Sequence, residues 1–247
     1  MKKKKTERLD KILVERGLAS TRARAQAMIL AVNVLVNDEP VTKAGTMVAE
    51  DAVIRLKEPE LRYVSRGALK LKGALEHFQV SVDQKLAIDV GASTGGFTEV
   101  LLESGARQVY TVDVGTNQLA WKIRSDDRVV SRENYNARTL KKEDFNQIFD
   151  IVVMDVSFIS IRLILPALAD VTRSGSDYLI LFKPQFEVGR EHIGEGGIVK
   201  DQVYAKALME ETIEWAKQIG LQSQGVMDSP IQGTDGNHEY LIYWKKV

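Results

Sequence analysis

The run Asp89-Val-Gly-Ala-Ser-Thr-Gly-Gly-Phe97 has the composition of a turn that binds a polar small molecule. An apolar segment precedes this run and an amphipathic helical pattern follows it, so the run joins a strand to a helix. Glycines at such a junction let backbone N–H groups and a helix N-terminus approach a ligand closely. Ser93 stands where a dinucleotide fingerprint needs its second glycine, and Phe97 stands where a phosphate loop needs lysine. The remaining pattern, an acidic strand end with a Gly-x-x-x-Gly-Gly turn, is typical of sites for S-adenosylmethionine.

Two later segments offer groups for the nucleoside half of such a cofactor. Asp113 ends the second apolar segment, where a carboxylate can accept hydrogen bonds from both hydroxyls of a ribose. Asn134, near the third segment, offers an amide to an adenine ring. Glycines that only make a tight turn, and an Asp113 that caps the next helix, are the alternative interpretation. The predicted cofactor residues are Asp89, Gly91, Ala92, Ser93, Thr94, Gly95, Gly96, Phe97, Asp113 and Asn134.

Four charged residues stand where charge is costly or where a strand begins or ends. Asp155 and Lys183 each close an apolar run, Lys70 lies on a helix before the first strand, and Glu239 opens the last strand. The carboxyl ends of neighbouring parallel strands meet at one edge of a sheet, so Asp155 and Lys183 should face the same cleft. A single strand-end lysine that extends into water would be the ordinary interpretation of Lys183. The set of four favours a catalytic site.

The elements that must position these residues form an alternating pattern. From residue 65 onward, apolar strands alternate with helical patterns, which predicts a mostly parallel sheet with helices on both faces. The final segment, 239–245, follows a turn-rich stretch too short for a crossover helix, so it should pair antiparallel with the strand before it. The fold class is therefore α/β, a Rossmann-like methyltransferase sheet whose last strand is antiparallel. The other strands are expected at 85–90, 108–113, 128–131, 150–155, 178–183 and 222–227.

Residues 1–58 are predicted to form a separate small domain of two helices and a few strands, joined through a linker at 59–64 to a domain at 65–247. The first helix ends at Gly17, and Ser20 or Thr21 can cap the second. Although the formal net charge of the chain is zero, residues 1–64 carry 13 Lys and Arg against 9 Asp and Glu. A basic module on a mildly acidic body favours contact with a polyanion over a merely solvated surface.

Three stretches of this small domain resemble the S4 RNA-binding domain: Arg8-Leu-Asp-Lys-Ile-Leu-Val-Glu-Arg-Gly17, Ser20-Thr-Arg-Ala-Arg-Ala-Gln-Ala-Met-Ile29 and Val34-Leu-Val-Asn37. Val32 and Asp38 stand where that family usually has glycine. The resemblance implies that basic side chains on one face contact RNA phosphates, in place of a solvated helix face. The residues assigned to RNA contact are Arg8, Lys11, Arg16, Arg22 and Arg24, with Arg66 and Arg190 of the larger domain.

The order Lys70, Asp155, Lys183, Glu239 resembles the catalytic tetrad of the FtsJ-type RNA ribose 2′-O-methyltransferases. With the S4-like module, nearly the whole chain resembles the TlyA (hemolysin A) family. The matching stretches are Tyr63-Val-Ser-Arg-Gly67, Asp89–Thr98, Thr111-Val-Asp-Val-Gly115, Met154-Asp-Val-Ser-Phe-Ile159 and Phe182-Lys-Pro-Gln-Phe-Glu-Val-Gly-Arg190. The resemblance implies S-adenosylmethionine-dependent 2′-O-methylation of a cytidine ribose in ribosomal RNA (23S, in some members also 16S), with ribosomal subunits as partners. Lys183 is the candidate for contact with the 2′-OH, either as a base or as a stabiliser of the developing alkoxide.

Composition removes several classes of function. The chain has no cysteine, so it has neither disulfides nor the thiolate that covalent pyrimidine methylation needs. Three scattered histidines do not suggest a metal site. No apolar run approaches a membrane span and the basic N-terminus lacks a signal-peptide core, so the expected location is the cytoplasm.

Three alternatives remain at this point. A base N-methyltransferase of the same fold is disfavoured, because Asp155-Val-Ser-Phe158 stands where such enzymes commonly have an Asn/Asp-Pro-Pro-aromatic turn. A non-catalytic RNA-binding or ribosome-assembly factor would bind RNA without the cofactor. A membrane-active hemolysin, suggested by the family's older name, would need a spanning or strongly apolar amphipathic segment, which the sequence does not show.

Overall fold

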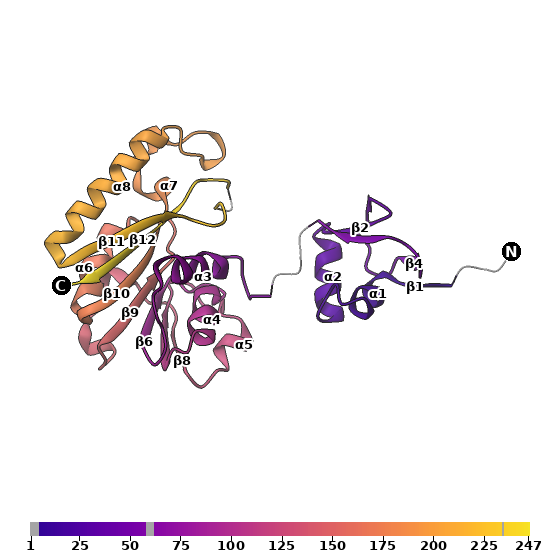
Figure 1. Cartoon of the computed structure of the whole chain (residues 1–247), viewed down its shortest axis with the longest axis horizontal. Coiled ribbons are helices and arrows are strands. Elements are labelled where there is room, and N and C mark those ends of the chain that lie inside the picture. The colour runs from indigo at the N-terminus through magenta and orange to yellow at the C-terminus, as the bar shows by residue number, and fades with distance from the viewer. Residues whose placement is uncertain (1–4, 58–61, 234) are drawn as a thin grey trace. The chain divides into compact units, whose positions relative to one another are not determined.

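A computed structural model describes residues 5–57, 62–233 and 235–247 (Figure 1). The chain divides into two compact units, Met1–Arg62 and Tyr63–Val247. Residues 59–61 of the expected linker at 59–64 lie outside the described residues, so the limits of the linker stay a prediction.

The smaller unit packs two short helices, α1 (Leu9–Glu15) and α2 (Arg22–Leu30), around a small apolar core. Thr21 caps α2, because its side chain accepts a hydrogen bond from the backbone N–H of Arg24 at 3.2 Å. Two small antiparallel sheets complete the unit, and the shortest of their strands show no alternation that could reveal them in the sequence. These strands are β1 (Thr6–Arg8) paired with β4 (Met47–Ala49), and β2 (Val34–Val36) paired with β3 (Glu39–Pro40) and β5 (Ile54–Leu56).

Two turns of this unit have left-handed backbone at residues that are not glycine. Val32 has φ 58° and Asp38 has φ 69°. These are the positions where S4 domains usually have glycine. The chain therefore keeps the left-handed turns without glycine, the residue that adopts them most easily. Strain is greater at Val32, since its branched Cβ is crowded in this conformation.

The larger unit is built on one seven-stranded sheet in the order β11-β12-β10-β9-β6-β7-β8. Strand β12 runs antiparallel to both of its neighbours, and the other pairings are parallel. The predicted α/β methyltransferase-type sheet with an antiparallel last strand is therefore confirmed. Its strands are β6 (Leu86–Val90), β7 (Gln108–Val112), β8 (Val129–Arg132), β9 (Phe149–Met154), β10 (Thr172–Phe182), β11 (Leu221–Asp228) and β12 (Tyr240–Lys246).

Helices cover both faces of this sheet (Figure 1). Alternate strand residues such as Ile88, Val152 and Ile180 share one buried core with Leu165 and Met209 from the helices on that face. Each fully buried side chain of this size contributes roughly 1.5–3 kcal/mol. Helices α3 and α4 pack against each other on the sheet's other side. The helices are α3 (Gly67–Phe78), α4 (Gly96–Glu103), α5 (Trp121–Arg124), α6 (Leu165–Asp170), α7 (Pro184–Glu187) and α8 (Gln202–Ala216).

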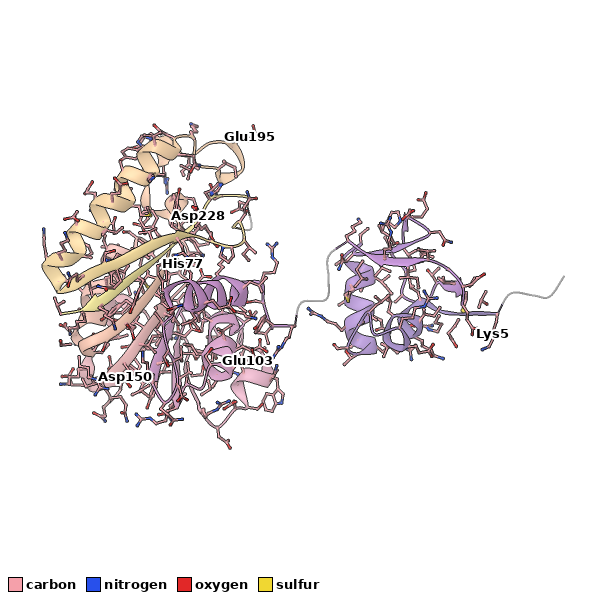
Figure 2. The ribbon with its side chains drawn as sticks, viewed as in Figure 1. Lys5, His77, Glu103, Asp150, Glu195 and Asp228 are labelled. Carbon is pink, nitrogen blue, oxygen red and sulfur yellow. The ribbon has the colours of Figure 1, made fainter. Side chains whose placement is uncertain are left out.

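The two ends of the strands can be followed in Figure 2, where Asp150 marks the beginning of β9 and Asp228 marks the end of β11. The turn after β6 and the segments after β9 and β10 leave the sheet at the edge marked by Asp228. The segment before β12 enters at the same edge, because Asp228 pairs with Tyr240. Ligands of open α/β sheets bind at this carboxyl edge.

Candidate active site

The glycine-rich run forms a tight turn between β6 and α4. Gly91 has φ 80°, and a Cβ on it would lie 2.5 Å from the backbone oxygen of Asp155. A Cβ on Gly96 would collide with Ser65 Oγ and lie 3.0 Å from the backbone nitrogen of Ala68. Only glycine lets the turn approach the end of β9 and the start of α3 this closely. The turn thereby brings the elements that carry Asp155 and Lys70 together.

Two adjoining cavities lie beside this turn. The first, of about 360 Å³, is lined by all four predicted catalytic residues and by most of the turn. The second, of about 380 Å³, lies between the turn and the ends of β7 and β9. The residues common to both cavities are Gly91, Ser93, Asp155 and Ser157.

The predicted catalytic residues form two ion pairs, of which the first is buried. Lys70 Nζ of α3 lies 2.5 Å from Oε2 of Glu239, the residue before β12. Their side chains are 9% and 2% exposed. The amide of Gln185, on α7, donates a hydrogen bond to the other carboxylate oxygen of Glu239 at 3.2 Å. A buried ion pair needs such additional partners, because desolvation offsets much of its attraction.

The second pair is more accessible and lies next to the first. Lys183 Nζ, at the end of β10, lies 2.6 Å from Asp155 Oδ1 and donates a hydrogen bond to Ser157 Oγ at 3.0 Å. The contact with Asp155 is an ion pair by distance rather than an aligned hydrogen bond, since Oδ1 has no acceptable hydrogen-bond geometry within the described part of the chain. The structure thus brings the four predicted residues to one cavity, while their catalytic role stays a prediction.

Asp89 lies beneath the turn and does not line either cavity. It is fully buried and accepts a hydrogen bond from Thr98 Oγ1 at 2.6 Å. Burial raises the pKa of the Asp89 carboxyl to about 7, with smaller increases from the charges of Asp155 and Asp113 and an opposing decrease from the Thr98 hydrogen bond. This hydrogen bond ties Asp89 to the first turn of α4, and the predicted role of Asp89 in cofactor binding stays a prediction.

Asp113 occupies the position expected for a ribose-binding carboxylate. It lines the second cavity and accepts hydrogen bonds from the backbone N–H groups of Ser93, at 2.8 Å, and Gly115, at 2.7 Å. Each oxygen keeps a further lone pair for a ligand hydroxyl. Of the turn residues, Gly91, Ala92, Ser93, Thr94, Gly96 and Phe97 line the first cavity. Gly95 does not line either of the two.

Asn134 follows β8, near the third strand as expected, and its contact with an adenine ring stays a prediction. Asn134 is exposed, has φ 51° and does not line either cavity, whereas Tyr135 and Asn136 line the second. The backbone N–H of Asn134 donates to the carbonyl of Gly115 at 3.1 Å, which fixes this turn. Asn136, whose side-chain oxygen accepts a hydrogen bond from the backbone N–H of Arg138 at 3.1 Å, is the asparagine that lines the second cavity.

An aromatic side chain lies unusually exposed at the second cavity. Phe158 lines it, is 91% exposed and has φ 64°, a conformation that is strained for an aromatic residue. Its ring contacts the ring of Phe186 with 4.9 Å between centroids. An exposed aromatic face beside this cavity suits a ligand with a flat ring.

Sequence reasoning missed several groups that support the predicted residues. Ser157 orients Lys183, Gln185 orients Glu239, and Ser65 packs on the turn at Gly96. All three lie within stretches that match the TlyA family, so those matches carried the signal, although no charge pattern singled the residues out.

Arginines of the smaller unit make hydrogen bonds within that unit. Asp10 is completely buried and accepts hydrogen bonds from Arg8, Arg22 and Gln26 at 2.9–3.0 Å. The guanidinium of Arg8, with Gln26 and Arg22, holds the pKa of the Asp10 carboxyl well below its usual range, against the opposing effect of burial. Arg16 donates to the backbone oxygens of Glu50 and Ala52.

The other basic residues assigned to RNA lie at the surface. Lys11 pairs with Glu7 at 3.5 Å and is about half exposed, and Arg24 is exposed on α2. Arg66 is exposed and lines the first cavity. Arg190 is exposed on the short 3-10 turn Arg190–His192 and stays outside the lining of both cavities. RNA contact by these seven residues stays a prediction.

Neither a metal centre nor a membrane span is found among the described residues. No group of three or more His, Cys, Asp or Glu side chains in 5–57, 62–233 and 235–247 could hold a metal ion. No helix in these ranges is both long and apolar enough to cross a bilayer.

Comparison with known proteins defines the class and then the family. Residues 63–246 match the FtsJ-like methyltransferase family, and residues 7–54 match the S4 domain. The chain is therefore an S4 domain joined to an FtsJ-like methyltransferase, an enzyme class whose fold implies S-adenosylmethionine as methyl donor. It belongs to the TlyA (hemolysin A) family.

Two relatives carry that conclusion. The 16S/23S rRNA (cytidine-2'-O)-methyltransferase TlyA of Mycobacterium tuberculosis is 44% identical over 238 residues, which cover 96% of this chain and 88% of that one. Hemolysin A of Brachyspira hyodysenteriae is 40% identical over 238 residues, which cover 96% of this chain and 99% of that one. Among solved structures, the "Putative hemolysin from Streptococcus thermophilus" has 45% identity and a TM-score of 0.77, covering 99% of this chain and 90% of that one.

Proposed function

We propose that this protein transfers a methyl group from S-adenosylmethionine to the 2′-OH of a cytidine ribose in ribosomal RNA. The observation that carries the proposal is the cavity in which Lys70, Asp155, Lys183 and Glu239 meet beside the glycine-rich turn. The M. tuberculosis relative, which shares this two-domain sequence over nearly its whole length, is named for that reaction on both 16S and 23S rRNA.

The two cavities fit the parts of the proposed cofactor. The first cavity, which is lined by the turn at Gly91 and by Lys183, suits the methionine half. Asp113 can hold the ribose hydroxyls, and the apolar lining by Ala137, Ile159 and Ile164 suits the adenine ring. When bound, S-adenosylmethionine supplies a methyl group that its sulfonium already activates.

The side chains of the first cavity then have separate tasks. A ribose hydroxyl is a poor nucleophile at neutral pH, so the site must align it and manage its proton. Lys183, oriented by Asp155 and Ser157, contacts the 2′-OH and either accepts its proton or stabilises the negative charge that develops on oxygen. The buried Lys70–Glu239 pair, braced by Gln185, holds α3 and the segment before β12 in place around the ribose.

The remaining surface fits an RNA substrate. Phe158 offers an exposed ring on which the base of the target nucleotide can stack, with base–aromatic stacking contributing roughly 1–3 kcal/mol. Arg66 places a guanidinium at the cavity that holds the four catalytic candidates, where it can bind a neighbouring phosphate. The S4 domain supplies further basic groups for the folded RNA.

Methylation by the purified protein tests the proposal. Large and small ribosomal subunits, each from a strain that lacks the protein, would be incubated separately with S-adenosylmethionine and then hydrolysed in alkali. We expect the phosphodiester 3′ of a single cytidine to resist cleavage, because a methylated 2′ oxygen cannot attack it. The matched control is Gly91→Val, which should abolish the modification, since its side chain would collide with the backbone of Asp155.

The same experiment separates the alternatives. A methyl group on a base, with every ribose still cleavable, would overturn the proposal in favour of an N-methyltransferase. Tight RNA binding without cofactor binding, measured by calorimetry in the presence of RNA, would favour a non-catalytic assembly factor. Leakage of liposomes caused by Gly91→Val protein as strongly as by wild type, with no methyl transfer by either, would favour a hemolysin. Modification of one subunit or of both then settles the target.

A further inference from the structure

Glu187, the last residue of α7, contacts the segment that carries Asp155. Its Oε2 accepts a hydrogen bond from the hydroxyl of Ser160 at 2.6 Å, and its Oε1 accepts one from the backbone N–H of Ile161 at 2.8 Å. Burial raises the pKa of the Glu187 carboxyl, and both hydrogen bonds oppose that rise. A carboxylate placed at the N-terminus of the 3-10 turn Ile161–Leu163 also satisfies an N–H group that the turn cannot.

Glu187 completes a series of contacts between two segments. Segment A, residues 155–161, follows β9, and segment B, residues 183–187, follows β10. Starting from the sheet, Lys183 contacts Asp155 and Ser157, the ring of Phe186 contacts that of Phe158, and Glu187 contacts Ser160 and Ile161. Among these contacts, only that of Glu187 binds the backbone of segment A.

Backbone support matters here because segment A is strained. Phe158, in its middle, has φ 64°. A bulky residue keeps such a conformation only where the surroundings hold it. Lys183 holds the beginning of the segment and Glu187 holds its end, so the strained residue lies between two fixed points. Without the contact from Glu187, segment A can relax. Asp155 and Ser157 would then shift relative to Lys183.

We propose that Glu187 is a positioning residue for methyl transfer: it fixes segment A against segment B so that Lys183 keeps its place at the reacting hydroxyl. The inference rests on the proposed function of the neighbouring cavity. Glu187 itself does not line either cavity and so acts through Lys183 rather than on substrate or cofactor.

Steady-state methylation of ribosomal subunits by the full-length chain tests the inference. We expect Glu187→Ala to lower kcat by about 10–100-fold with KM for the subunits unchanged, because small misplacements of catalytic groups reduce turnover by such factors. Glu187→Gln should recover most of kcat, since its amide oxygen can accept from Ile161 and its amide nitrogen can donate to Ser160. The matched control is Glu211→Ala, which removes an exposed carboxylate that binds Arg162 of the same 3-10 turn and should leave kcat unchanged.

A double-mutant cycle shows whether Glu187 acts through Lys183. In a Lys183→Ala background, Glu187→Ala should have little further effect on kcat. Hydrogen exchange at the Ile161 amide should be faster in Glu187→Ala than in wild type, whether or not methyl transfer occurs. Failure of the proposed function would appear as a wild-type protein without methyl transfer. An active wild type with a Glu187→Ala variant of equal kcat, or a Glu187→Gln variant as slow as Glu187→Ala, would overturn the positioning role.

Discussion

Both units of this protein place charged side chains around a carboxylate, but they use the arrangement differently. In the smaller unit, Asp10 is entirely buried and its cations, Arg8 and Arg22, are about 39% and 51% exposed. In the larger unit, Lys70 and Lys183 are only 9% and 12% exposed, and both they and their carboxylates line a cavity.

The difference separates a structural cluster from a reactive one. Around Asp10, the carboxylate lies in the interior and fixes two arginines whose outer nitrogens remain in water, where they can also meet phosphate. In the larger unit, water has been removed from the cations themselves, and the open space beside them is left for a ligand. Substitutions in the first cluster should therefore change stability, and substitutions in the second should change turnover.

The largest effect is expected at Lys183. Lys183→Ala should lower kcat about 100- to 10,000-fold, the range that acid–base groups contribute, while RNA affinity stays near wild type. Lys183→Arg distinguishes the two tasks of the ammonium, because guanidinium can stabilise an alkoxide but cannot accept a proton. Turnover would be measured with saturating cofactor and ribosomal subunits, and RNA affinity by filter binding.

Near-normal turnover of Lys183→Ala, with binding intact, would remove Lys183 from the mechanism and with it the contrast between the two clusters. Substantial activity of Lys183→Arg would assign the residue to charge stabilisation rather than to proton removal. Lys72→Ala is a suitable control, because Lys72 lies on the surface of α3, pairs with Glu76 only at 3.9 Å, and should leave both quantities unchanged.

The next largest effect concerns Asp10. Asp10→Asn leaves two guanidinium groups facing an amide that cannot neutralise them, so the smaller unit should lose about 3 kcal/mol of stability. The pKa of Asp10 is lowered in the folded state, so its contribution is present above the ordinary carboxyl pKa and is lost as the pH falls below it. Hydrogen exchange of the α1 and α2 amides in the full chain would measure the loss.

The control for this prediction is Asp38→Asn. Asp38 also pairs with an arginine, Arg55, but both side chains are more than half exposed, so the substitution should change stability by less than about 1 kcal/mol. Equal losses of stability in the two variants would show that burial does not determine how much these ion pairs stabilise the smaller unit. The comparison between the units would then have no physical basis.

Asp89 provides a pH-dependent test within the larger unit. Its folded pKa of about 7 lies above the unfolded value, so ionisation opposes folding as the pH rises between the two. Asp89→Asn should therefore stabilise the unit relative to wild type more at pH 8 than at pH 5, by about 2–3 kcal/mol. Thermal unfolding of the larger unit at both pH values would measure the difference.

Asp177 is the matched control, since it is also a buried carboxylate of the same sheet. Despite burial, hydrogen bonds from Lys245, Lys85 and Tyr243 lower the pKa of Asp177. Asp177→Asn should thus destabilise equally at pH 5 and pH 8. If Asp89→Asn behaves in the same way, Asp89 is ionised in the folded protein throughout this range.

The sequence predicted the larger unit better than the details of its site. Apolar strands that alternate with helices leave few arrangements, and Lys183 and Asp155 were placed together because parallel strands end at one edge. The sequence could not show which residues after β8 line the second cavity, because that turn takes its shape from a tertiary hydrogen bond between Asn134 and Gly115, which no local pattern reveals. Asp10 was overlooked for a similar reason: its partner Arg22 comes from a different helix, so the sequence shows only a basic surface.

The smallest effect is expected at Val32, where the smaller unit keeps a left-handed turn without glycine. Val32→Gly removes roughly 1–2 kcal/mol of backbone strain, and the greater freedom of glycine in the unfolded chain offsets about half of that gain. The net stabilisation should be below about 1 kcal/mol, visible as slower hydrogen exchange in α2. Val36→Gly is the control, because Val36 is also half-buried but lies in strand β2 without a positive φ, so it should destabilise. If both variants lose stability equally, the turn at Val32 carries no strain, and the glycine of related S4 domains serves some purpose other than backbone geometry.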